Sequence, residues 1–168
     1  VMTQQGTAGN DTLYGTGIDE TLQGLGGNDY IYGEGGADDL SGGADNDRLY
    51  GGDGADTLTG GVGDDRLEGG NGTDVYMLGA GWGRDTISNY DYSGDGAATP
   101  DVVIFGAGVD AGDIQVSRVL SDLMLEHANG VDALRISRHF SGDRYAVSEV
   151  RFASGTVWTA AMLQAMAQ

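Results

Sequence analysis

The sequence predicts an all-β solenoid, in which short strands stack coil upon coil. Between Gly6 and Met77 the chain repeats every nine residues, eight times in register, with glycine at the first position, an acid at the sixth and an apolar residue at the eighth. A short fixed period is typical of repeats that bury their apolar residue only against neighbouring coils. Short alternating apolar stretches after residue 100 extend the expectation of strands towards the carboxy terminus.

Charge is the second constraint on the class of protein. The 168 residues carry 26 acids against 8 arginines and no lysine, for a formal net charge of -18, and 15 of the acids but only two arginines precede residue 78. Self-repulsion on this scale opposes a compact state unless cations bind. Nucleic acid and anionic membranes are not expected partners of the repeat half, because both require a basic surface.

Cysteine-based cross-links and membrane-targeting segments are not expected from this sequence. There is no cysteine, so neither a disulfide nor a thiolate zinc site can form. No run of 18 apolar residues and no basic-then-apolar amino terminus occurs, so neither a membrane span nor a Sec-type signal peptide is expected. The 32 glycines sit at fixed phases of the repeat, which indicates turn positions rather than linkers.

Each nonapeptide has the chemistry of a turn followed by a very short strand. Six glycine-rich residues form a tight turn whose carbonyl oxygens can point inward, and in the three that follow the eighth residue points into the core. Calcium prefers six to eight oxygen ligands, more than one turn supplies. Because each block turns the chain about halfway round, alternate blocks stack on the same side, and a cation fits between two such turns.

The pattern G-G-x-G-x-D-x-U-x, in which U is apolar, resembles the repeats-in-toxin (RTX) family, and the eight blocks cover 72 of the 168 residues. The resemblance implies a right-handed parallel β-roll with about six calcium ions, held by the sixth-position aspartates and by carbonyls of the glycine turns. The expected aspartate ligands are Asp11, Asp29, Asp38, Asp47, Asp56, Asp65 and Asp74, with Asp85 and Asp101 from beyond the repeats. The expected turn glycines are Gly9, Gly27, Gly36, Gly43, Gly52, Gly54, Gly61, Gly63, Gly70 and Gly72.

Two blocks depart from the pattern. The second has Ile18 in place of the fourth-position glycine and Glu20 in place of the aspartate. A β-branched residue at positive φ is costly, so sites that use this block are expected to be weak or absent. Asp45 takes the same fourth position in the fifth block, a milder change because aspartate tolerates the left-handed region.

After Met77 the period slips by two residues and returns as a degenerate ninth block, Ala80 to Ser88, which contains Asp85. We therefore expect a β-roll over residues 1–88 and a β-rich flanking or capping region over 89–168. Residues 89–100 are expected to form a loop, with two interpretations open. Asp91, Asp95 and Asp101 hold a further calcium ion, or the loop is a solvated acidic segment.

The flanking region is expected to form strands from the apolar pairs Ile114/Val116, Leu123/Leu125, Leu134/Ile136 and Val150/Phe152, with a turn at residues 153–158. Residues 78–158 resemble the domain that follows RTX repeats in many secreted proteins, which implies a cap for the open end of the solenoid. The tail predicts a short helix packed on the last coil, with Thr159 as N-cap and Met162, Leu163 and Met166 on one face. Whether the tail belongs to an export signal stays open.

No catalytic motif stands out. The two histidines do not form HExxH, there is no G-x-S-x-G elbow, and neither an EF-hand nor a phosphate-loop pattern occurs. The sequence therefore predicts a non-catalytic module. By its resemblance it is a monomeric calcium-binding part of a secreted bacterial protein, exported by a type I machinery and folding on calcium outside the cell.

An adhesin or carbohydrate-targeting module with structural calcium is the alternative. Tyr14, Tyr32 and Tyr50 recur at the ninth position of alternate blocks and should form a ladder on one face. The ladder either stabilises the roll by stacking or contacts a carbohydrate.

Overall fold

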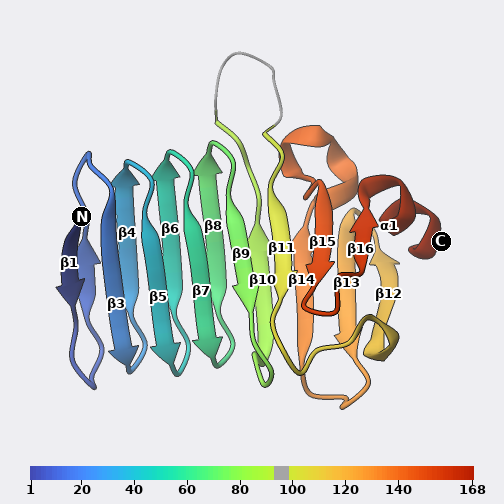
Figure 1. Cartoon of the computed structure of the whole chain (residues 1–168), viewed down its shortest axis with the longest axis horizontal. Helices are drawn as coiled ribbons and strands as arrows, with labels where there is room; N and C mark the ends of the chain where they lie inside the picture. The colour runs from blue at the N-terminus through green and yellow to red at the C-terminus, as the bar shows by residue number, and fades with distance from the viewer. Residues whose placement is uncertain (93–98) are drawn as a thin grey trace.

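The computed structural model describes residues 1–92 and 99–168 and consists mainly of strands (Figure 1). Two eight-stranded sheets run the length of the molecule, and the chain coils between them from the amino-terminal end to the carboxy-terminal end. In spatial order, the first sheet contains β1 (Met2–Gln5), β3 (Glu20–Gly26), β5 (Asp39–Ala44), β7 (Thr57–Val62), β9 (Val75–Leu78), β11 (Val102–Phe105), β15 (Glu149–Phe152) and β16 (Val157–Thr159). The second contains β2 (Thr12–Tyr14), β4 (Tyr30–Gly35), β6 (Arg48–Asp53), β8 (Arg66–Asn71), β10 (Arg84–Ser88), β14 (Ala133–Ser137), β13 (Asp122–His127) and β12 (Ile114–Val119). The predicted all-β solenoid is confirmed.

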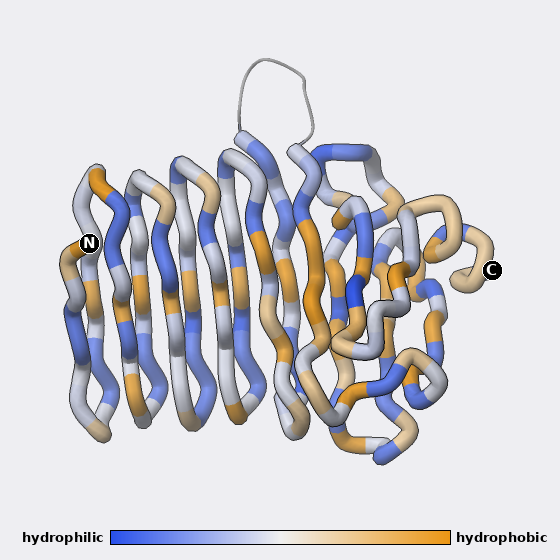
Figure 2. Tube along the Cα trace, viewed as in Figure 1, coloured by the Kyte–Doolittle hydropathy of each residue, from blue (hydrophilic) through white to orange (hydrophobic). Residues whose placement is uncertain are grey.

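The nine-residue period sets the register. Parallel strands pair residues 18 apart, such as Leu22 with Leu40 and Ile31 with Leu49, so one block is half a turn of the solenoid. The eighth-position side chains point between the sheets, where they form a ladder of apolar residues along the axis. From the second block on they are fully buried: Leu22, Ile31, Leu40, Leu49, Leu58, Leu67 and Tyr76. Figure 2 shows a hydrophobic band at the middle of successive coils of the repeats.

Beyond the repeats both sheets continue without interruption past residues 88 and 89, where the sequence predicts the boundary between the two regions. The ninth block lies on the next coil, since β10 pairs in parallel with β8 at a spacing of 20 residues, which absorbs the two-residue slip. β14 and β15 then pair in parallel with β10 and β11. The last strands are antiparallel, β12 and β13 in one sheet and β16 in the other, and they end the coiling.

The carboxy-terminal core is aromatic. Trp82 packs on Phe105 with ring centroids 5.1 Å apart, Phe105 on Phe152 at 5.3 Å, and Phe152 on Trp158 at 4.6 Å. The predicted turn is shorter than expected, because Trp158 already belongs to β16. Short 3₁₀ helices lie between the strands at η1 (Ala111–Asp113), η2 (His139–Ser141) and η3 (Asp143–Tyr145).

The predicted terminal helix is α1 (Ala160–Met166), which contacts β16 and β12 at the end of the two sheets. Thr159 caps it as expected, its hydroxyl oxygen accepting from the Met162 N–H at 3.4 Å. The predicted inward face is only partly right. Leu163 is fully buried, but Met162 and Met166 are 44% and 37% exposed, and the second inward position is Ala167, one turn after Leu163.

Candidate metal sites

The sixth-position acids form two ladders, one along each sheet. In each ladder the Oδ1 of an aspartate accepts a hydrogen bond from the backbone N–H of the residue 18 positions earlier, as Asp47 does from Asp29 at 2.8 Å. The same bond recurs at Asp29, Asp38, Asp56, Asp65 and Asp74, with lengths of 2.8 to 2.9 Å. From the second block on, the sixth-position acids are buried. From Asp29 on, these bonds fix each carboxylate of the repeats against the preceding coil.

The second carboxylate oxygen has no such partner. The buried Oδ2 atoms of six aspartates accept no hydrogen bond, and neither does Glu20 Oε1. The six are Asp29, Asp38, Asp47, Asp56, Asp65 and Asp74. Buried polar atoms are nearly always paired, so an unpaired oxygen repeated at one phase calls for an explanation. These oxygens fit a bound cation, which would replace the missing hydrogen-bond donors.

In the first six blocks, the first glycine lies beside both the carboxylate of its own block and a carbonyl oxygen of the next coil. A Cβ added to Gly33 would lie 2.7 Å from Asp38 Oδ2 and 2.5 Å from the carbonyl oxygen of Gly51 on the next coil. Gly24, Gly42 and Gly51 show the same pair of oxygens. Glycine at the first position is thus required by close approach. Carboxylate and carbonyl oxygens gathered at one turn are the hard ligands that calcium prefers.

Burial raises the pKa of these acids. It raises the pKa of Asp74 and Asp85 to about 8 and that of Asp47 to about 7; neighbouring carboxylates raise these pKa values further, and the ladder hydrogen bonds lower them. For Asp56 and Asp65 the same burial gives a pKa of about 6. Without a cation, ionised carboxylates therefore destabilise the folded repeats near neutral pH.

The turn glycines at the second and fourth positions adopt positive φ. These are Gly43, Gly52, Gly61 and Gly70 at the second position and Gly27, Gly36, Gly54, Gly63 and Gly72 at the fourth. A Cβ on Gly61 would also collide with the carbonyl oxygen of Gly43, so the turn carbonyls stack along the edge from coil to coil. Gly9, the remaining predicted glycine, does not have positive φ. The first block therefore has a different turn.

The first two blocks differ from the others in their acids as well. Asp11 is half-buried, and its Oδ2 accepts from both the backbone N–H and the hydroxyl of Thr7. Glu20 is buried and its Oε2 accepts from the Thr16 N–H in the same turn. The strain expected at Ile18 does not occur, because Ile18 does not have positive φ; its side chain is 54% exposed. The turn of the second block adopts another conformation instead.

In each of the next three blocks, one residue other than glycine has positive φ. Asp45 has φ 75°, as the sequence predicts, and Leu25 and Glu34 have φ 83° and 73° at the second position. Left-handed backbone costs an L-residue roughly 1–2 kcal/mol. These turns therefore hold strain that glycine would remove.

Asp85 and Asp101 extend the two ladders beyond the repeats. Asp85 Oδ1 accepts from the Asp65 N–H at 2.9 Å, and Asp101 Oδ1 accepts from the Asp74 N–H at 2.7 Å. Asn89 donates to Asp101 Oδ2 at 2.8 Å, so both oxygens of Asp101 are occupied by protein.

The expected loop site falls partly outside the described residues. Asp91 is buried, and its charge contributes to raising the pKa of Asp101, after burial itself. Asp95, the third expected ligand, lies outside the described residues.

A further ladder, at the fifth position, was not anticipated from the sequence. Asn10 Oδ1 accepts from the Asn28 N–H at 2.8 Å, Asn28 Oδ1 from the Asn46 N–H, and Asn46 Oδ1 from the Asp64 N–H. Asp64 Oδ1 continues it to the Arg84 N–H. Asn or Asp at the fifth position of alternate blocks was the signal available in the sequence. Each of these turns is therefore held to its neighbouring coils by two kinds of hydrogen bond, one at the fifth position and one at the sixth.

Side chains alone do not make a metal site in the part of the chain that the structure describes. Within residues 1–92 and 99–168, no group of three or more His, Asp or Glu side chains has a metal-binding arrangement. Calcium needs six to eight oxygens, so the backbone carbonyls of the turns have to supply most of them.

A solenoid of stacked coils, with one buried acid and one glycine-rich turn per block, defines a calcium-binding repeat protein. The model of the RTX calcium-binding nonapeptide repeat matches in four copies, at residues 5–17, 14–49, 41–76 and 50–87. The haemolysin-type calcium binding protein related domain matches residues 122–162. The chain belongs to the RTX calcium-binding repeat family.

Among curated proteins, the iron-regulated protein FrpA of Neisseria meningitidis serogroup C is 43% identical over 96 residues. The match covers 55% of this chain and 8% of that protein, so the chain spans a small part of the relative's length. RTX repeats bind calcium and form a structural fold rather than an enzyme family. Among the described residues, none of the helices has the length and apolar character to span a membrane.

Proposed function

We propose that this chain is a calcium-gated folding module of a secreted protein. Its repeats are disordered at low calcium and fold on binding calcium outside the cell. The observation that carries this proposal is the set of six buried aspartate oxygens without a hydrogen-bond partner, all at the same phase of the repeat. They leave the metal-free fold incomplete at each coil.

The proposed ligands are the sixth-position aspartates together with turn carbonyls from two stacked blocks. The positive-φ glycines hold those carbonyls in place, and the ladder hydrogen bonds orient each carboxylate. About six sites are expected from eight blocks. Sites that use the first two blocks should be the weakest, because Asp11 and Glu20 are engaged by their own turns and neither turn has the positive-φ geometry.

Charge repulsion and chain entropy make the folding of the repeats depend on calcium. The net charge of -18 and the 32 glycines oppose folding in the absence of cations. A cation that binds only the folded state stabilises it by about 2.7 kcal/mol per site at 100 times the dissociation constant. Several sites in one stack therefore give a steep response to calcium. Disorder at low calcium suits passage through the narrow channel of a type I secretion machinery.

The carboxy-terminal region, residues 89–168, is proposed as the cap on which the last coil of the 1–88 roll is built. Its support is the parallel pairing of β14 and β15 with β10 and β11, which covers the last edges of the coiled strands. A cap with its own aromatic core provides a folded surface next to the last calcium-dependent coil, on which the other coils can then fold.

Circular dichroism of the full chain with excess calcium and with excess chelator tests the proposal. We expect a large gain of β signal on adding calcium, reversed by chelator, and isothermal titration should count several ions. A chain that is equally rich in β structure in both conditions would contradict calcium gating.

A further inference from the structure

Half of the arginines gather on one face of this acidic protein. Arg48, Arg66, Arg84 and Arg135, which we call the arginine strip, line one hollow of about 680 Å³ on the outer face of the second sheet. All four are exposed. The sequence alone suggests a lack of basic surface, because these residues are spread over 88 positions of an acidic chain.

The strip follows from the strand register. The seventh position of each block points outward because the eighth points into the core. Tyr30, Arg48 and Arg66 are direct partners on β4, β6 and β8, and Thr86 and Arg135 continue the row on β10 and β14. Neighbouring strands lie about 4.8 Å apart, so Arg48 and Arg66 are side by side and Arg135 is two strands further along.

Three of the four arginines of the strip have no carboxylate partner among the described residues, whereas Arg135 forms an ion pair with Asp122. Like charges directly opposite on paired strands destabilise a sheet. Within residues 1–92 and 99–168, no carboxylate forms an ion pair with Arg48, Arg66 or Arg84. Arg48 lies over the ring of Tyr30, 5.3 Å from its centroid, which orients the guanidinium without neutralising it. The free charges are available to an external anion.

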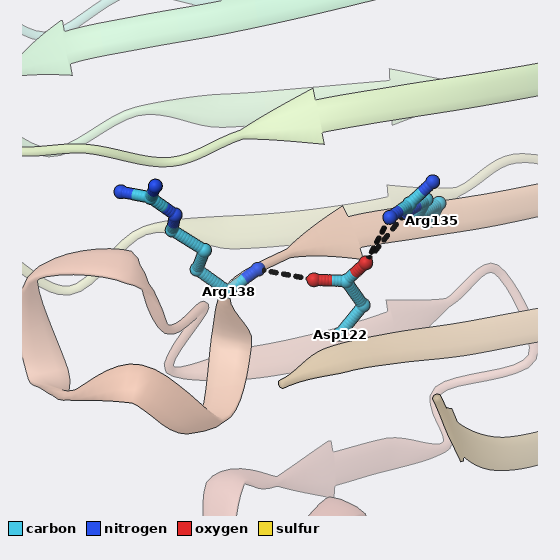
Figure 3. Close-up of polar contacts among 3 residues, drawn as sticks. All are labelled: Asp122, Arg135 and Arg138. Atoms are coloured by element: carbon cyan, nitrogen blue, oxygen red, sulfur yellow. Dashed lines mark hydrogen bonds and ion pairs between the residues drawn. The ribbon is translucent and has the colours of Figure 1, made fainter. Parts of the chain in front are cut away.

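Asp122 fixes the end of the strip (Figure 3). It accepts from Arg135 Nε at 2.6 Å and from the Arg138 backbone N–H at 2.7 Å. The side chain of Arg138 extends away from Asp122, and its guanidinium lies 5.6 Å from the ring centroid of Tyr145. Arg138 therefore adds a cation beyond the strip.

The hollow continues past the ends of β10 and β14. A second hollow of about 500 Å³ shares Arg66, Ser88 and Ser137 with the first and reaches Arg138 and Tyr90. Uncharged hydrogen-bonding groups line the first hollow between the arginines: Asn28, Tyr30, Asn46, Thr86, Ser88 and Ser137.

Three acids also border the first hollow, Asp47, Asp64 and Asp65. The Oδ1 of each already accepts a backbone N–H in the ladders, and Asp47 and Asp65 are buried. The exposed charged groups in the hollow are therefore the four arginines and Asp64.

We propose that the arginine strip binds a linear acidic polysaccharide, with its carboxylate or sulfate groups on the arginines and its hydroxyls on the Asn, Ser, Thr and Tyr side chains. The outward rows of the sheet, two residues apart along a strand, are separated by about 7 Å, and Arg48, Arg66 and Arg135 lie in a single such row, as a linear ligand requires. A DNA duplex carries one charge per 1.7 Å or so and is much wider, and it would meet the acidic turns on either side. This proposal requires the folded roll, and does not depend on how calcium gates folding.

Isothermal titration in saturating calcium and about 0.1 M salt tests the proposal. The probes are a sulfated and a uronate oligosaccharide of defined length, a neutral dextran of the same length, and a DNA duplex of equal charge. We expect both acidic oligosaccharides to bind and dextran not to bind. The double variant Arg48→Gln/Arg66→Gln should weaken binding about tenfold or more, because hydrogen bonds to charged groups are lost.

The matched control is Arg118→Gln/Arg151→Gln, which changes the net charge equally but lies away from the strip, on β12 and β15. It should weaken binding less than about twofold. Circular dichroism of each variant separates loss of folding from loss of binding, and Arg84→Gln gives a second site in the hollow. Equal weakening by both doubles, no preference for acidic over neutral sugar, or tighter binding of the duplex would overturn the proposal.

Discussion

The repeats and the carboxy-terminal region are built on the same two sheets but stabilised differently. In the repeats each coil contributes two small apolar side chains to the core, such as Leu40 and Leu49. In the carboxy-terminal region the core is a cluster of aromatic rings around Phe105 and Phe152. Aromatic rings bury more apolar area per residue than the leucine side chains of the repeats do.

The buried acids of the two regions also differ, in whether protein groups satisfy both of their carboxylate oxygens. Asp122 is paired by Arg135 and the Arg138 N–H; burial alone would raise its pKa, but these partners leave the pKa below its usual value. Asp74, in the repeats, has an unpartnered oxygen and a pKa raised by burial to about 8. Asp122 is thus satisfied by protein groups, whereas the acids of the repeats are left for a cation. We expect one region to fold by itself and the other to depend on its ligand.

Protonation of the buried aspartates should stabilise the metal-free repeats in place of calcium, and this is the largest expected effect. Buried aspartates with a pKa of about 6 to 8, such as Asp56 and Asp74, bind protons more tightly when folded than when unfolded, where the pKa is near 3.8. The stability of the metal-free fold is therefore greatest below about pH 4 and is lost as the pH rises through 6 to 8. Circular dichroism in calcium-free buffer should show β structure growing as the pH falls. More β structure at pH 8 than at pH 5 would contradict the unpaired-acid account.

The aromatic core should carry most of the calcium-independent stability. Phe105→Ala removes a fully buried ring and should cost about 3–5 kcal/mol in chemical unfolding with saturating calcium. Val157→Ala, at a 40% exposed position of the same region, is the control and should stay within about 0.5 kcal/mol. In chelator, the near-ultraviolet signal of the tryptophans should disappear in Phe105→Ala and persist in Leu49→Ala. The reverse result would place the autonomous core in the repeats.

Two aspartates three residues apart test the assigned phase of the ladder. Asp56→Ala removes a buried carboxylate and leaves the Asp38 N–H unpaired, at a cost of about 1–3 kcal/mol, and should shift the calcium midpoint. Asp53→Ala removes only an exposed hydrogen bond with Asn71 and should cost about 0.5 kcal/mol or less. Calcium titrations of both variants measure the difference. Equal effects would remove the sixth position from the ligand set.

The smallest expected effect is a gain in stability. Leu25 is 48% exposed with φ 83°, so Leu25→Gly should relieve the left-handed strain and stabilise the calcium-bound protein by about 0.5 kcal/mol after the entropy of glycine is subtracted. Val62→Gly, at an exposed strand position without positive φ, should instead destabilise it by about 0.5–1 kcal/mol. Thermal unfolding of the two variants should move in opposite directions; a loss in both would mean that the turn at Leu25 is unstrained.

Much of the repeat region follows from the sequence because its interactions are local and periodic. A nine-residue period with one apolar residue predicts the strand, its buried face and the 18-residue pairing of Leu22 with Leu40. The same period predicts which acid faces the turn. The fifth-position ladder through Asn28 was missed because an asparagine in a turn is usually explained by local hydrogen bonding.

The carboxy-terminal region was less predictable because its pairings are not periodic. Alternation predicts strands at Leu134 and Val150, but not that they continue the two sheets of the repeats in parallel, 49 and 47 residues after their partners Asp85 and Val103. In α1, composition alone predicts three inward residues, whereas packing against β16 and β12 leaves only Leu163 buried in the helix, together with Ala167 just after it.

The sequence by itself determined the solenoid, the phase of its acids and its family, since a short repeat specifies the same local geometry in every block. Only the tertiary structure decided which carboxylate oxygens are left unpaired and where the arginines meet. Arg66 and Arg135 are 69 residues apart in the chain, and they line one hollow because β8, β10 and β14 are successive strands of the second sheet. Contacts of that kind depend on how the ends of the stack pair, which no local pattern encodes.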